Sequence, residues 1–235
     1  MILCCDTATD YATLAVCDDN GTLYAASTLR RHRDLSVRLL NDIDAVLAAA
    51  GPTFDAIDTL ATGLGPGSFT GVRVAVTTFR TLAQATGKRL IGVETLALYA
   101  RGLSDSLSGV CVIALLPSRR GEVYASAYSG ARCIRPAFAA TFDELRDAAA
   151  ALAAEYRVLL TGPDGVLPAE FPVFPFVPAS APSPQTFARL AADAAQRGLF
   201  ADPLGLNPLY VVAPAINQHK DPRTAARLKG LTQPV

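Results

Sequence analysis

A glycine-rich segment at residues 63–73 constrains the fold more than any other part of the chain. It reads GLGPGSFTGVR and connects an apolar run at 57–62 to an amphipathic run at 72–86. This order is typical of a buried strand that turns tightly into a helix, because glycine permits sharp turns and close backbone approach. Backbone N–H groups at a helix start favour anions. The segment therefore indicates either a phosphate-binding loop or a structural turn capped by Ser68 or Thr70.

Three familiar motifs do not fit this segment. A P-loop ends in Gly-Lys-Ser/Thr, but the first lysine of the chain is Lys88. The dinucleotide fingerprint G-x-G-x-x-G fails because Ser68 or Thr70 stands at the third glycine position. A hydrolase elbow, G-x-S-x-G, fails because Pro66 and Thr70 flank Ser68 at the required positions. Phosphate binding by a different loop and a purely structural turn both stay open.

Strand and helix patterns alternate along the first hundred residues. Two expected strands meet at Asn20-Gly21, which is a strong hairpin turn. Apolar residues then recur at helical spacing over 34–50 and 72–86. The expected strands lie at 1–5, 11–17, 22–29, 57–62 and 90–93, with a short helix at 94–101. This order predicts an α/β fold with a mixed sheet.

A small polar segment at 102–109 predicts a linker, after which the strand pattern restarts. Thr141 and Glu144 form a predicted capping box at the start of a helix. The expected strands lie at 110–116, 122–128 and 158–161, and the expected helices at 141–154 and 185–197. We therefore predict a first lobe at 1–103, a second lobe of similar design at 104–215 and a basic tail at 216–235.

Composition excludes several classes of protein. The 21 Lys and Arg balance the 21 Asp and Glu, so the whole chain lacks the positive charge of a general nucleic-acid binder. With 51% hydrophobic residues the chain is too apolar to be disordered. The longest uncharged stretch, 171–188, contains five prolines, which excludes a membrane helix, and the N-terminus lacks the basic region of a signal peptide. The five cysteines form no CxxC, and we expect buried free thiols in a reducing cytoplasm.

The sequence resembles the TsaB (YeaZ) family of the bacterial pathway that forms threonylcarbamoyladenosine in tRNA. The most specific likeness is GPGSFTGVR at 65–73. Further similar segments are the opening strand with its Asp6-Thr7 turn, the helix over 36–51, IGVETL at 91–96, RRGEVY at 119–124 and PLY at 208–210. The likeness is strong over residues 1–100 and patchy afterwards.

The resemblance implies an actin-like, Hsp70-like ATPase (ASKHA) fold with two related lobes that contain mixed sheets. It implies a cytoplasmic, non-catalytic scaffold that has no metal or cofactor and binds the TsaD-type paralogue, which performs the transfer. A TsaE-type ATPase and tRNA would bind to the complex of the two proteins. Whether the free chain is a monomer or a homodimer stays open. The phosphate-type loop would then be vestigial, and it comprises Asp6, Thr7, Gly65, Gly67, Ser68, Thr70 and Gly71.

Individual residues agree with a loss of catalysis. The transferase paralogue is expected to hold a metal through paired helical histidines, but His32 has Ser36 at i+4. Pro117 stands where family members often carry an acid, and Leu35 where they often carry a histidine. Val211-Val212 replaces an arginine that often follows the motif at Tyr210.

A partner is expected to dock on the two helices at 34–50 and 72–86. The predicted interface comprises Ser36, Arg38, Leu39, Asp42, Ile43, Arg73, Val76, Phe79 and Arg80. Helical periodicity by itself assigns the apolar members to the core more often than to a surface, so both interpretations stay open.

Two other functions remain as alternatives. An active ATP-dependent, kinase-like enzyme of the same fold needs phosphate loops in both lobes, an adenosine-binding segment and a catalytic carboxylate, and only the first requirement is half met. A glycoprotease lacks a credible nucleophile–base pair, because the only histidines are His32 and His219.

Overall fold

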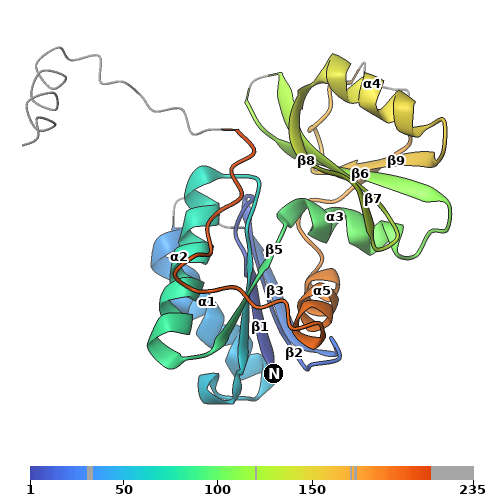
Figure 1. The fold of residues 1–235 in the computed structure, drawn as a ribbon. Coiled ribbons are helices and arrows are strands. Elements are labelled where there is room, and N and C mark those ends of the chain that lie inside the picture. The colour runs from blue at the N-terminus through green and yellow to red at the C-terminus, as the bar shows by residue number, and fades with distance from the viewer. Residues whose placement is uncertain (31–33, 120, 170, 172–173, 213–235) are drawn as a thin grey trace, which may run out of the picture.

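The computed structural model describes residues 1–30, 34–119, 121–169, 171 and 174–212, which contain two five-stranded mixed sheets (Figure 1). The first sheet has the order β3-β2-β1-β4-β5 and the second has the order β10-β9-β6-β7-β8. The strands of the first sheet are β1 (Ile2–Asp6), β2 (Tyr11–Cys17), β3 (Leu23–Arg30), β4 (Thr59–Gly63) and β5 (Arg89–Val93). Those of the second are β6 (Val110–Pro117), β7 (Glu122–Ser129), β8 (Arg132–Thr141), β9 (Arg157–Gly162) and β10 (Phe176–Pro178).

The two sheets share one topology. The central strands β1 and β6 each pair antiparallel with the strand that follows them, β2 or β7. Each central strand pairs in parallel on its other side, with β4 or β9. The predicted α/β fold with two related lobes of mixed sheets is therefore confirmed.

Both faces of the first sheet are covered by helices. α1 (Leu35–Ala50) and α2 (Phe69–Thr86) cover one face, and α5 (Pro184–Gln196) covers the other (Figure 1). Successive side chains of a strand point to opposite faces. Leu3 therefore packs with the core under α1 and α2, whereas Cys4 packs with the core beside α5. This double burial explains the uninterrupted apolar start of the chain.

The second sheet has the same layered build. α3 (Thr95–Ser104) packs against β6 and β7, and α4 (Phe142–Leu152) covers the opposite face. The predicted capping box is present, since the Thr141 hydroxyl accepts the Glu144 N–H and the Glu144 carboxylate accepts the Thr141 N–H. Among the described residues no helix is long and apolar enough to span a membrane.

Four local expectations need correction. β8 was not predicted, because this edge strand has an irregular register and exposes most of its first half, so its apolar alternation is weak. α2 begins at Phe69, since Ser68 is its N-cap, and α3 continues to Ser104 into the expected linker. Four cysteines are buried free thiols as expected, but Cys133 is exposed.

The chain returns to the first lobe after the second sheet. Residues 199–212, which we call the C-terminal strap, follow α5 along the edge strand β5 (Figure 1). Ala201 N–H donates to Leu90 C=O (2.8 Å), and Leu209 N–H donates to Leu64 C=O (2.8 Å). The boundaries at 103 and 215 stay predictions, and the tail at 216–235 lies outside the described residues.

Candidate functional site

The first component of the candidate site is the turn between β1 and β2, whose carboxylate is enclosed. Asp6 ends β1 and is completely buried. Its Oδ1 accepts the Ala8 N–H (3.0 Å), and its Oδ2 accepts the Thr95 hydroxyl (2.6 Å). Burial raises the pKa of the Asp6 carboxyl, outweighing the two hydrogen bonds, which lower it. Both carboxylate oxygens of Asp6 therefore accept hydrogen bonds from the chain itself.

The glycine-rich loop lies directly on this turn. The Thr7 hydroxyl donates to the Gly71 carbonyl (2.7 Å), and the Ser68 N–H donates to the Ala8 carbonyl (2.7 Å). A Cβ atom added at Gly71 would overlap the Thr7 carbonyl oxygen, and one added at Gly67 would overlap that of Ala8. Only glycine allows this approach of two backbones. In this structure the loop therefore packs directly against the turn, and no Cβ atom fits at Gly67 or Gly71.

Two other residues of the loop, Gly65 and Ser68, also form hydrogen bonds that hold the loop in place. Gly65 N–H donates to the Thr95 hydroxyl oxygen (3.1 Å), and the peptide bond from Gly65 to Pro66 is cis. Ser68 Oγ accepts the Gly71 N–H (3.2 Å), which is the capping role considered from the sequence. Thr70 is exposed on the first turn of α2.

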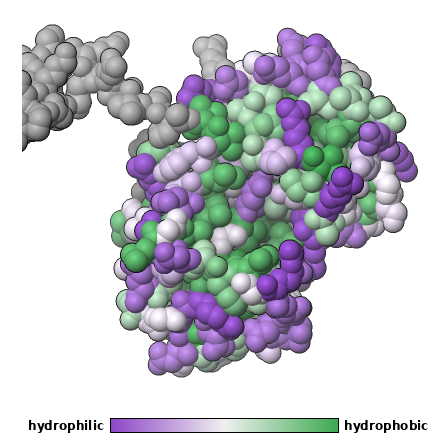
Figure 2. All heavy atoms as spheres, viewed as in Figure 1, coloured by the Kyte–Doolittle hydropathy of each residue, from purple (hydrophilic) through white to green (hydrophobic). Residues whose placement is uncertain are grey.

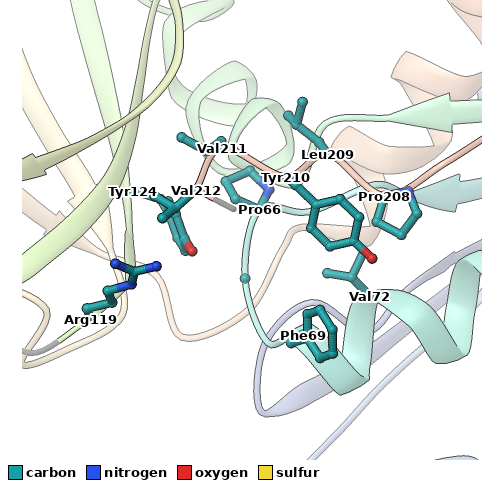
Figure 3. Close-up of a pocket in the computed structure, with 11 residues that line it drawn as sticks. Pro66, Phe69, Val72, Arg119, Tyr124, Pro208, Leu209, Tyr210, Val211 and Val212 are labelled. Carbon is teal, nitrogen blue, oxygen red and sulfur yellow. The ribbon is translucent and has the colours of Figure 1, made fainter. Parts of the chain in front are cut away.

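Two adjoining cavities lie between the lobes, and residues of the glycine-rich loop line both of them. The larger holds about 710 Å³ and is bordered by polar residues that include Thr9, Ser68 and Asp164. The smaller holds about 290 Å³, and we call it the apolar pocket (Figure 3). Its lining comprises Pro66, Gly67, Phe69, Val72, Arg119, Tyr124, Pro208, Leu209, Tyr210, Val211 and Val212. Tyr124 and Arg119 belong to the second lobe, so both lobes build the pocket.

Beside the apolar pocket, three side chains form the aromatic–arginine stack. The Arg73 guanidinium lies 3.7 Å from the centroid of the Phe69 ring and donates to the Tyr210 hydroxyl (3.0 Å). The two ring centroids are 6.0 Å apart. The stack was not expected, because Arg73 and Tyr210 are 137 positions apart in the sequence.

The predicted interface divides into buried and accessible residues. Leu39, Ile43, Val76 and Phe79 are at most 3% exposed, and Asp42 is also buried. The assignment of these five residues to a docking surface is corrected, because all five are buried and the four apolar side chains pack in the core. Ser36, Arg38 and Arg73 are exposed, and Arg80 is partly exposed; their role as an interface stays a prediction.

Metal binding draws no support from the described part of the chain, where no three His, Cys, Asp or Glu residues cluster. The two histidines, His32 and His219, lie outside that part. The expected absence of a metal and a cofactor stays a prediction.

Comparisons with known proteins agree on one family. A family model described as "TsaD: tRNA N6-adenosine threonylcarbamoyltransferase" matches residues 28–177. The "tRNA threonylcarbamoyladenosine biosynthesis protein TsaB" of Escherichia coli is 37% identical over 127 residues, which is 54% of either chain. The protein of the same name from Haemophilus influenzae is 31% identical over 125 residues, or 53% of this chain and 52% of that protein. The chain spans about half the length of these curated relatives.

Solved structures extend the likeness over nearly the whole chain. A Pseudomonas aeruginosa structure, described as an uncharacterized protein with similarity to peptidase YEAZ, superimposes with a TM-score of 0.77 and 25% identity. The match covers 90% of this chain and 99% of that one. A second structure, "YeaZ from Pseudomonas aeruginosa", gives a TM-score of 0.72 at 25% identity and covers 89% of this chain and 98% of that one.

Proposed function

The chain belongs to the TsaD family and is related to its TsaB (YeaZ) members, and we propose that it is a non-catalytic partner subunit in threonylcarbamoyladenosine formation on tRNA. Its partner is the TsaD-type paralogue that performs the transfer. It acts in the cytoplasm, and a TsaE-type ATPase and the tRNA join through the complex.

The observation that carries this proposal is the enclosed carboxylate of Asp6. In a kinase-like enzyme an acid at the end of the first strand must reach metal, water or phosphate. Here the Asp6 oxygens accept hydrogen bonds from Ala8 and Thr95, and Gly67 and Gly71 of the loop pack closely on the same turn. Both features favour a structural use of the turn.

The exposed side of α1 is the docking surface that we assign to the paralogue. Val37 is 79% exposed and Leu40 is 56% exposed, although both side chains are large and apolar. Ser36 and Arg38 lie beside them and are also exposed. Apolar side chains flanked by polar ones are typical of a protein–protein interface. On α1, Ser36 and Arg38 therefore keep their predicted role, with Val37 and Leu40 in place of the buried residues.

Size-exclusion chromatography with light scattering tests the proposal, using this chain and the TsaD-type subunit of the same organism. We expect one discrete complex for the natural chain. Val37→Asp with Leu40→Asp should weaken that complex by about tenfold or more, since exposed anchors carry most binding energy. Leu107→Asp is the matched control, because Leu107 is 40% exposed and lies outside α1 and α2.

Two separate peaks for the natural chain, also with ATP and the TsaE-type protein present, would contradict the proposal. Metal-dependent ATP turnover by the isolated chain would favour the kinase-like alternative. That turnover should then be lost in Asp6→Asn, which tells it apart from a contaminating ATPase.

A further inference from the structure

The apolar pocket opens at the surface, and its rim is apolar. Phe69 is 46% exposed, Tyr210 42% and Leu209 38%. In the space-filling view, hydrophobic side chains gather in the middle of the face between the two lobes (Figure 2). At about 30 Å³ per water molecule, the cavity of about 290 Å³ has the room of about ten waters. That is enough for a large apolar side chain supplied from outside.

The rim is held in place before any partner arrives. The C-terminal strap is fixed to Leu64 through the N–H of Leu209. Further along, the Arg80 guanidinium donates to the carbonyls of Pro203 (2.7 Å) and Leu204 (3.0 Å). The aromatic–arginine stack joins α2 to the strap at the rim itself. A surface ordered in advance loses little conformational entropy on binding.

The rim of the pocket carries the positive charge of Arg73. Among the described residues Arg73 contacts only neutral groups, the Phe69 ring and the Tyr210 hydroxyl, and makes no ion pair. Further along the strap, Arg80 also donates to neutral groups, the carbonyls of Pro203 and Leu204. Guanidinium groups form their strongest hydrogen bonds with carboxylates. The surface therefore complements a ligand that carries acidic groups next to an apolar one.

We propose that the apolar pocket and the aromatic–arginine stack form a second docking site, which takes an apolar side chain flanked by carboxylates from a segment of the partner subunit. This site lies at the N-terminal end of α2 and on the strap, apart from the exposed side of α1. The inference rests on the proposed function, because the occupant is the TsaD-type subunit.

A protein segment fits the site better than single-stranded nucleic acid does. Nucleic-acid platforms offer open aromatic faces on which bases stack. Here the Arg73 guanidinium already covers one face of Phe69, and the exposed rim residue Leu209 is aliphatic. Aliphatic side chains pack against other apolar side chains but do not stack on bases.

Calorimetric titration of the TsaD-type subunit into this chain tests the second site. Arg73→Glu and Leu209→Asp are each expected to weaken binding by about tenfold or more. Arg132→Glu on β8 and Leu107→Asp are the matched controls, since both residues are exposed on other parts of the surface, and both should bind within about twofold of the natural chain. Arg73→Gln, which only removes the charge, should have an intermediate effect, and thermal melting verifies that each variant folds.

The outcomes separate this inference from the proposed function. If the natural chain binds and the Arg73 and Leu209 variants bind as tightly as the controls, the second site is overturned and the proposed function stands. If the natural chain binds no TsaD-type subunit, both fall. If Arg73→Glu loses affinity for an anticodon stem–loop RNA while subunit binding is unchanged, the site belongs to RNA and the inference is overturned.

Discussion

Replacing Phe79 by alanine distinguishes a core residue from an interface residue. Phe79 is fully buried in the cluster that α1 and α2 form with the first sheet, where its neighbours include Leu39 and Leu60. Loss of a fully buried Phe side chain removes about 1.5–3 kcal/mol of transfer free energy. The cavity left behind raises the total to about 3–5 kcal/mol. The sheet and two helices enclose the site, so collapse of the cavity is limited and we expect about 4 kcal/mol.

Calorimetric melting of the isolated chain measures this loss. For a chain of this size 1 kcal/mol corresponds to about 2–4 °C, so Phe79→Ala should lower the Tm by about 8–16 °C. The matched control is Phe69→Ala in the same helix, where the side chain is 46% exposed and the stability should change by about 1 kcal/mol or less. If Phe79→Ala melts within about 2 °C of the natural chain but no longer binds the partner, our assignment of Phe79 to the core is wrong.

Three further substitutions test the local structure. Gly71→Ala places a methyl group on the Thr7 carbonyl, so urea unfolding should show a loss of about 1–3 kcal/mol, although alanine is the better helix former. Burial raises the pKa of the Asp6 carboxyl in the folded chain above its unfolded value near 3.8. The protonated carboxyl therefore stabilises the fold at low pH, and this contribution is lost as the pH rises through the folded pKa. Asp6→Asn should therefore be more stable than the natural chain at pH 8, with a difference that shrinks towards pH 4; a constant difference would contradict the reasoning. Thr141→Ala removes the capping box of α4 and should cost about 1 kcal/mol in the same assay, and no change would show that the cap is dispensable.

The sequence by itself determined the order of elements and the general architecture. The turn at Asn20-Gly21, the helical spacing over 34–50 and the capping box at Thr141 are local signals, because each arises from residues close together in the chain. All three are present in the structure. The edge strand β8 was missed because its exposed first half, from Arg132 to Pro136, lacks the alternation that burial imposes.

The tertiary structure alone decided which of these residues are available for function. Asp6 is enclosed by Thr95, which lies 89 positions later, and Arg73 is fixed by Tyr210 from the returning strap. Helical periodicity could not separate buried Leu39 from a surface residue, because a stripe of apolar side chains suits a core and an interface alike. A local pattern records the period of a helix or strand, but which distant segment covers a side chain is set only when the sheets, helices and strap pack together.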